Sequence, residues 1–212
     1  SMLDKSTIDM IYDGAPCDDA IDLAFSKAKV ENRKNWLLQH DPATFMNFDV
    51  DEVTYTDFVH KELILFSMAD NARSIPSAVD GFKTSQRKVQ FSCFKRKDLQ
   101  KSEIKVAQLA GYVSEHSAYH HGEMSLNGTI VGMAQNFCGS NNINLLVPSG
   151  QFGTRIQGGK DAASPRYIFT KIAPVTRFIF PEADDAVLNY QEEDGNMPAI
   201  IITLCTRRPG RF

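Results

Sequence analysis

Hydrophobic residues recur at the three- and four-residue spacing of α-helices in five stretches of this sequence. The first helix is predicted to follow a cap at Asp18-Asp19, and its apolar face consists of Ile21, Ala24, Phe25 and Ala28. The other four are predicted over residues 56–68, with Thr56 as the cap, and over residues 85–97, 104–115 and 123–137. The last two are joined by a polar turn that fits both a helix-turn-helix and an ordinary helical hairpin, Tyr119-His120-His121-Gly122.

The pattern changes after Phe137, where short apolar runs alternate with glycine-rich sequence. Residues 144–147 and 167–170 are predicted as strands, and residues 150–164 between them hold four glycines and indicate a long exposed loop. A helix pair followed by a glycine-rich hairpin is the order of a winged-helix DNA-binding domain. The predicted fold class is therefore α+β and mainly helical, with a helix-turn-helix and a β-hairpin wing.

The composition of the 212 residues is that of an ordinary folded protein, with 42% hydrophobic and 23% charged residues. No run of 18 apolar residues is present, so no membrane partner is expected. The formal net charge is −3, but residues 83–177 hold 13 basic and 5 acidic side chains, whereas residues 1–82 hold 7 basic and 15 acidic ones. The basic middle segment is typical of nucleic-acid binding, although a solvated lysine-rich helix face gives the same pattern.

The cysteines are far apart and lack zinc-site spacing, so we expect free thiols in a reducing compartment; they are Cys17, Cys93, Cys138 and Cys205. The N-terminus has no signal-peptide pattern. The chain begins Ser1-Met2, which we interpret as a cloning scar ahead of a fragment of a longer protein.

The sequence has no glycine-rich nucleotide loop, no G-x-S-x-G nucleophile elbow and no H-E-x-x-H metal motif. The features that remain are Arg166-Tyr167, His120-His121 and the cations Lys83, Arg87, Lys88, Lys95 and Arg96. A tyrosine hydroxyl ordinarily titrates near pH 10, and a neighbouring arginine stabilises both its phenolate and a phosphodiester transition state. Histidine can exchange the proton. The set fits transesterification with DNA, while each member alone also fits a structural role, such as a core tyrosine.

Longer motifs carry a resemblance to a known family. They are Y-T-D-F-V-H-K-E-L-I-L-F-S (55–67), R-S-I-P-S-A-V-D-G-F-K-T-S-Q-R-K-V (73–89), K-V-A-Q-L-A-G-Y-V-S-E (105–115), A-Y-H-H-G-E-M-S-L (118–126), A-Q-N-F-C-G-S-N-N-I-N-L-L (134–146) and G-Q-F-G-T-R-I-Q-G-G-K-D-A-A-S-P-R-Y-I-F-T (150–170). With them, residues 56–177 resemble the DNA-gate region of eukaryotic type II DNA topoisomerases. Residues 18–37, with R-K-N-W-L at 33–37, resemble the end of the metal-binding TOPRIM domain and the link that leaves it.

The resemblance implies a role for each matching residue. Tyr167 would be the nucleophile that becomes linked to a 5′-phosphate, Arg166 would stabilise the transition state, and His121 would be the third catalytic residue. The DNA-binding residues would be His120 and Tyr119 beside the scissile region, Ser125 near the recognition helix, Lys83 and Arg87, and Arg33 and Lys34 in the link. To these the residue pattern adds Lys95 of the basic helix and Arg155 of the glycine-rich loop.

The same resemblance implies three regions: the end of a TOPRIM-like region and linker at 1–40, the winged-helix DNA-gate domain at 41–172, and the truncated start of a tower domain at 173–212. A homodimer acting on double-stranded DNA in the nucleus is implied, with ATP used by the full-length protein. Mg²⁺ would be bound by TOPRIM residues outside this chain, and each Tyr167 would work with the metal site of the partner subunit.

Several departures from the family pattern limit what this chain does alone. It has no acidic metal motif and no ATPase domain, Lys83-Thr84-Ser85 stands where the family has K-P-G, and the end from residue 197 onward diverges. We therefore expect the fragment alone to bind DNA without cleaving it. The alternative is a non-catalytic winged-helix module that binds duplex DNA, with Tyr167 structural.

Overall fold

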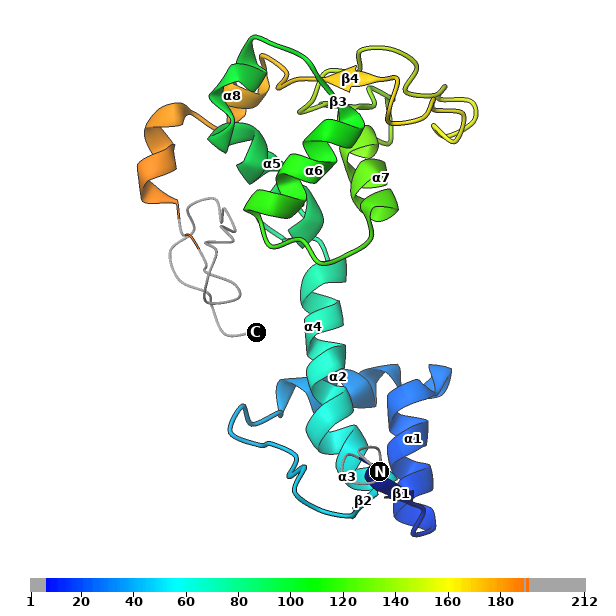
Figure 1. Cartoon of the computed structure of the whole chain (residues 1–212). Coiled ribbons are helices and arrows are strands. Elements are labelled where there is room, and N and C mark those ends of the chain that lie inside the picture. Colours follow the sequence, from blue (N-terminus) through cyan, green and yellow to red (C-terminus); the bar gives the residue numbers. More distant parts are fainter. Residues whose placement is uncertain (1–6, 189, 191–212) are drawn as a thin grey trace. The chain divides into compact units, whose positions relative to one another are not determined.

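The computed structural model describes residues 7–188 and 190 and divides the chain into two compact units. Within the described part, the first unit covers residues 7–74 and the second covers residues 75–190 (Figure 1). The boundary expected after residue 40 falls inside the first unit, because strand β1 (Asp9–Ile11) pairs in parallel with β2 (Glu52–Thr54) across it. Residues 41–74 therefore belong with the N-terminal segment.

Helices make up most of the first unit: α1 (Ala15–Phe25), the 3₁₀ turn η1 (Lys27–Lys29), α2 (Val30–Leu38), α3 (Tyr55–Phe58), the π-helical turn η2 (Val59–Leu63) and α4 (Ile64–Ser74). Both predicted caps here are wrong. Helix α1 begins after Gly14, whose φ of 92° favours glycine, so Asp18 lies inside the first turn. At α3 the cap is Thr54, whose hydroxyl accepts the Asp57 amide proton at 3.1 Å.

The second unit contains the predicted basic helix and helix pair. Its elements are α5 (Thr84–Lys95), η3 (Lys97–Gln100), β3 (Ile104–Lys105), α6 (Val106–His116), α7 (Glu123–Ala134), β4 (Phe169–Thr170), α8 (Thr176–Ile179) and η4 (Glu182–Val187). Strand β3 pairs antiparallel with β4, so that Ile104 faces Thr170 and Lys105 faces Phe169. Isolated antiparallel bridges join Leu146 to Ile172 and Ser149 to Phe169. The prediction of a mainly helical α+β fold is confirmed.

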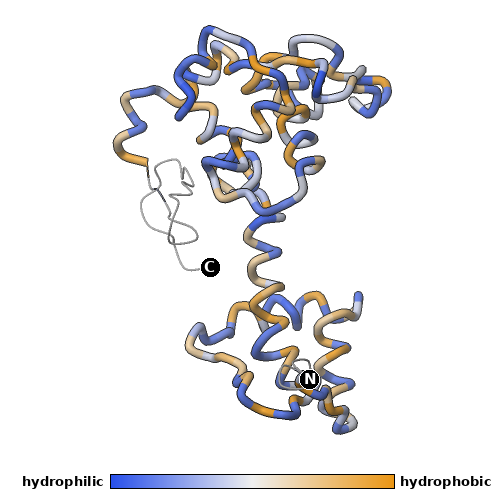
Figure 2. Tube along the Cα trace, in the orientation of Figure 1, coloured by the Kyte–Doolittle hydropathy of each residue, from blue (hydrophilic) through white to orange (hydrophobic). Residues whose placement is uncertain are grey.

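A single hydrophobic core holds the second unit together. Its buried members come from α5, α6 and α7 and from the chain around β4, with Val89, Leu109, Ile130 and Ile168 among them. Figure 2 shows apolar positions interspersed with polar ones along these helices, and in α5 every residue from Arg87 to Phe94 is buried. Residues 173–188 pack on the same core through Phe180 and Leu188. The predicted tower boundary at residue 173 stays a prediction, and the divergent end with Cys205 lies outside the described residues.

None of the helices in the described part of the chain is both long and apolar enough to cross a membrane.

Candidate functional site

Arg166 and Tyr167 lie on a tight turn that leads into β4. The backbone of this turn is fixed: the Tyr167 amide donates to the Ser164 carbonyl at 2.9 Å, and the Ala107 amide of α6 donates to the Pro165 carbonyl at 3.1 Å. Ile168 is buried in the core, whereas Arg166 is exposed and the Tyr167 side chain is 74% exposed. The turn therefore presents a phenol to solvent from a rigid backbone, and Tyr167 is not a core tyrosine.

The joint between α6 and α7 separates its aromatic residues into buried and exposed ones. Tyr119 is buried, and its hydroxyl donates to the Ser125 Oγ on α7 at 3.4 Å. The His121 ring packs edge-on against the Tyr119 ring with centroids 5.4 Å apart. Both His120 and His121 are exposed. The structure thus brings the Tyr119 side chain into contact with both His121 and Ser125.

The glycine-rich loop is ordered by contacts that require glycine. The Gln135 amide of α7's C-terminal flank donates to the Phe152 carbonyl at 2.8 Å. A Cβ on Gly159 would lie 2.1 Å from Nε2 of Gln135, and one on Gly153 would lie 2.7 Å from the Gly159 backbone. Both glycines also have positive φ, so no other residue fits either position without displacing the loop.

Two further contacts brace the same loop. The Asp161 carboxylate accepts the Thr154 amide proton at 2.8 Å, and this bond lowers the pKa of Asp161 below its ordinary value. The Nε of Arg155 donates to the Cys138 carbonyl at 2.8 Å while Arg155 remains exposed. The loop consequently holds Arg155 and Lys160 on a fixed frame at the surface.

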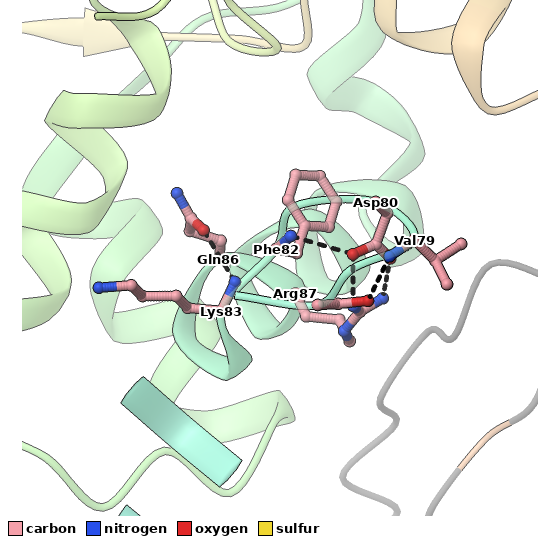
Figure 3. A network of polar contacts seen from close by, with 7 residues as sticks. Val79, Asp80, Phe82, Lys83, Gln86 and Arg87 are labelled. Atoms are coloured by element: carbon pink, nitrogen blue, oxygen red, sulfur yellow. Dashed lines mark hydrogen bonds and ion pairs between the residues drawn. The ribbon is translucent and has the colours of Figure 1, made fainter. Parts of the chain in front are cut away.

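The predicted cations at the start of α5 have different environments. Lys83 is exposed, and its backbone amide donates to Oε1 of Gln86 at 2.9 Å. Arg87 is only 5% exposed, and its guanidinium donates twice to the Asp80 carboxylate, at 2.6 and 2.7 Å (Figure 3). A buried bidentate pair of this kind holds the Asp80-Gly81 turn against α5. In this placement the guanidinium is directed at Asp80 inside the unit, and the predicted contact of Arg87 with DNA stays a prediction.

Lys95, at the other end of α5, is exposed, with its ammonium 5.9 Å from the centroid of the Phe91 ring. In the first unit, Lys34 is exposed and pairs with Glu31 at 2.7 Å. Arg33 is half-buried, and its guanidinium donates to the carbonyls of Leu23 and Ser26 at the end of α1, at 3.1 and 2.6 Å. The Nη1 of Arg33 is thus used to cap α1, which the sequence pattern did not indicate.

Lys88 is the residue whose position sequence reasoning missed most clearly. The sequence groups it with the cations of a basic helix, yet it is buried and its ammonium donates to the Ala118 carbonyl at 2.9 Å. The apolar residues that follow it, Val89, Phe91, Cys93 and Phe94, alternate with Gln90 and Ser92 and were the available signal that this part of α5 is buried. Its partner lies 30 residues away and could not be read from the sequence.

Among the described residues, no group of three or more histidine, cysteine, aspartate or glutamate side chains is placed to hold a metal ion. Tyr167 makes its described hydrogen bond through its backbone amide, which donates to the Ser164 carbonyl. The His121 ring makes its described contact with the Tyr119 ring. The site consequently consists of two exposed features on the second unit, a phenol beside a guanidinium and a pair of imidazoles, with cations on the same unit.

Comparisons with known proteins agree on one family. The family model for the A-type subunit of DNA gyrase/topoisomerase IV matches residues 73–202, and the model for the C-terminal associated domain of TOPRIM matches residues 1–71. DNA topoisomerase 2 of Arabidopsis thaliana is 59% identical over 187 residues, which is 88% of this chain and 13% of that protein. DNA topoisomerase 2 of Saccharomyces cerevisiae is 61% identical over 176 residues, 83% of this chain and 12% of that protein.

A solved structure gives the same result. The DNA-binding, cleavage and re-ligation domain of Plasmodium falciparum topoisomerase II superposes with a TM-score of 0.73 at 52% identity, covering 91% of this chain and 26% of that one. The chain therefore spans about an eighth of the length of its full-length relatives. Because one family model covers more than half of the chain and the relatives are so similar, this chain belongs to the type II DNA topoisomerases.

Proposed function

We propose that this chain is the DNA cleavage and religation core of a type II topoisomerase. In the proposed reaction, the Tyr167 oxygen attacks a phosphodiester, a bond forms between that oxygen and phosphorus, and the 3′ oxygen of the neighbouring sugar leaves. The observation that carries the proposal is the exposed phenol beside Arg166 on a backbone-fixed turn. The phosphotyrosyl ester conserves the energy of the broken bond, so resealing needs no further energy source.

The neighbouring residues have distinct proposed tasks. Arg166 holds a non-bridging oxygen of the phosphodiester and stabilises the charge that develops in the transition state. His121, with His120 beside it, exchanges the proton that leaves the phenol or joins the 3′ oxygen. Tyr119 and Ser125 position the His121 ring through the contacts described above.

We infer that α6 and α7 form a helix-turn-helix and that residues 147–169 form the wing. The antiparallel bridge between Ser149 and Phe169, the β3–β4 pair and the ordered glycine-rich loop support this interpretation. In a winged helix, α7 would enter a groove of duplex DNA while the wing lies along the phosphates. Lys83, Lys95 and Arg155 on the second unit, with Lys34 on the first, would contact the backbone. Arg33 would do so through the part of its guanidinium not used at the end of α1.

The metal and nucleotide chemistry is proposed to come from outside this chain. Mg²⁺, when bound by TOPRIM residues of the complete protein, would polarise the phosphate. ATP would be used by a separate domain of the full-length, homodimeric enzyme, which we place in the nucleus. As the family resemblance implies, each Tyr167 would work with the metal site of the partner subunit.

The test uses the full-length protein from which this chain comes, with Mg²⁺, supercoiled DNA and a denaturant quench. A covalent protein–DNA adduct is expected, and Tyr167→Phe should abolish it. Tyr12→Phe is the matched control, since it removes an exposed hydroxyl that bonds to Asp18 in the first unit and should leave the adduct intact. An adduct that survives Tyr167→Phe contradicts the assigned nucleophile.

The same assay separates the two DNA-binding functions. If the full-length protein forms no adduct but binds duplex DNA with an affinity that falls steeply with salt, the non-catalytic binding module is correct. The 212-residue chain alone should bind DNA and form no adduct, because it lacks the metal ligands.

A further inference from the structure

The backbone at the joint between α6 and α7 has an unusual conformation at Ala118. Its φ is 46°, and it is the only non-glycine residue with positive φ in the described part of the chain. A side chain with a Cβ is strained in this region, and such strain persists only where surrounding contacts impose it. Ala118 immediately precedes Tyr119, His120 and His121, so the strained residue sets the direction in which these three side chains leave the backbone.

Three contacts hold the residues around this strain. Ser117 is buried, and its hydroxyl donates to the Val113 carbonyl of α6 at 2.6 Å. Tyr119 is tied to α7 through Ser125. Between them, the Ala118 carbonyl accepts the Lys88 ammonium at 2.9 Å, which connects the joint to α5. Each residue of the sequence 117–119 is therefore fixed to a different helix.

Lys88 is unsuited to bind a phosphate directly in this conformation. The residue is 6% exposed, and its ammonium is directed at a backbone carbonyl inside the unit. Burial of an ammonium is costly unless hydrogen bonds compensate, so a lysine at this position implies that the contact has a purpose beyond packing. The contact is made to the residue two positions before His120.

We propose that Lys88 is a positioning residue for the cleavage chemistry. By holding the Ala118 carbonyl, its ammonium maintains the left-handed backbone that buries Tyr119 and directs His120 and His121 toward solvent. Because Lys88 acts through the backbone, its loss should change the orientation of the imidazoles and leave the lysine and arginine contacts to the DNA backbone intact. This inference rests on the proposed function, since only cleavage gives the orientation of His121 a chemical consequence.

The experiment uses Lys88→Met, Ala118→Gly and the double variant in the full-length protein. Lys88→Met should slow adduct formation by about tenfold or more while the slope of log Kd against log salt for duplex DNA stays unchanged. Glycine adopts positive φ without strain, so Ala118→Gly should restore most of the lost rate in the double variant. Lys101→Met, which removes an exposed lysine on the segment after α5, is the control and should behave as the wild type.

Three results would overturn the proposal. An unchanged adduct rate in Lys88→Met shows that the contact has no role in cleavage. A slope of log Kd against log salt that falls by about one shows instead that Lys88 binds a phosphate. A double variant that is folded but as slow as Lys88→Met shows that Lys88 does not act through Ala118. If Lys88→Met does not fold, Lys88→Gln, which keeps a neutral donor, should give an intermediate rate that Ala118→Gly raises.

A second readout does not depend on activity. In the 212-residue chain, the His121 ring protons should show a ring-current shift from the edge-on Tyr119 ring. Lys88→Met should reduce this shift, and the added Ala118→Gly should restore it. If the wild-type enzyme forms no adduct, the proposed function fails while the NMR result still decides whether Lys88 orients His121.

Discussion

The two units of this chain both consist mainly of helices and loops but are stabilised to different extents. In the described part of the first unit, the buried apolar residues are few: Cys17, Ala20, Val53, Val59 and Ile64. The second unit has a continuous core that includes three helices and the chain around β4. Burial of apolar surface is the main source of folding free energy, so the second unit should be the more stable one.

Ion pairs from the two units differ in burial, and the more deeply buried pair lies in the second unit. The ion pair Lys61–Asp57 of the first unit is well exposed, with side chains 39% and 48% accessible. The pair Arg87–Asp80 of the second unit is 7% and 4% accessible. Exposed pairs contribute little, whereas breaking a buried pair leaves an uncompensated charge. The unit that carries the candidate site thus has both a continuous apolar core and a buried ion pair, which suits a site that must hold reacting groups in fixed positions.

The largest expected difference is in thiol reactivity, because each unit contains one fully buried cysteine. Burial raises the pKa of Cys93 to about 12, so at pH 8 its thiolate fraction is roughly one part in 10⁴ even when a reagent can reach it. Exposed Cys138 should therefore react with a thiol reagent at least about a thousandfold faster than Cys93. Cys17, buried in the first unit, should react at an intermediate rate through local opening.

This measurement is made by mass spectrometry after timed labelling, with Cys205→Ser so that three sites remain to be assigned. Unfolding the protein in urea should make the three rates equal, which controls for differences in intrinsic reactivity. If Cys17 is labelled as slowly as Cys93, the first unit is as well closed as the second and the comparison above is wrong.

The next effect concerns the two ion pairs. Arg87→Met should lower the free energy of unfolding by about 3–5 kcal/mol, because it leaves the Asp80 carboxylate buried without its guanidinium. Lys61→Met in the first unit should cost less than about 1 kcal/mol. Urea denaturation followed by circular dichroism measures both. Adding Asp80→Asn to Arg87→Met removes the uncompensated charge while keeping an acceptor for the Phe82 amide, and it should recover part of the loss.

A chemically identical substitution in the two units isolates the contribution of packing. Leu109→Ala, at a fully buried position in the core of the second unit, should cost about 2–5 kcal/mol. Leu38→Ala, at an exposed position at the end of α2, should change stability by about 0.5 kcal/mol or less. Equal losses would show that Leu38 is buried in solution and that the first unit has a larger core than its structure indicates.

The same contrast explains how much could be predicted from the sequence. Helices α5, α6 and α7 were predicted within a few residues because they are amphipathic or apolar over three turns and end at glycine or polar joints. The first unit was predicted less well. The first unit extends beyond residue 50 because Asp9–Ile11 pairs with Glu52–Thr54. The residues near either strand do not indicate that the two strands pair, because they lie about 40 positions apart in the sequence.

The candidate site shows a similar division between local and distant determinants. The sequence singled out Tyr167 and the joint at Tyr119-His120-His121 as candidates because their motifs are contiguous, and their functional roles stay predictions. It did not distinguish a cation directed outward, such as Lys83, from Arg87 and Lys88, which are directed inward. That distinction depends on Asp80 and on the Ala118 carbonyl, which reach α5 only after the chain has folded.

The smallest expected effect is a pH dependence in the glycine-rich loop of the second unit. The Thr154 amide proton stabilises the Asp161 carboxylate and lowers its pKa from the ordinary 3.8. A lowered pKa means that the folded loop binds its proton less readily than the unfolded chain. The contribution is therefore fully present above about pH 4 and is lost as the pH falls through the folded pKa. An NMR titration of the Asp161 carboxyl carbon should give a midpoint below 3.8, and the protection of the Thr154 amide against exchange, taken relative to its intrinsic rate at each pH, should fall over the same range. Asp161→Asn keeps the acceptor oxygen but cannot titrate, so it should remove the pH dependence of this protection while leaving the loop ordered. A midpoint at or above 3.8 would mean that the loop does not hold this hydrogen bond in solution, and the fixed frame inferred for Arg155 would lose its support.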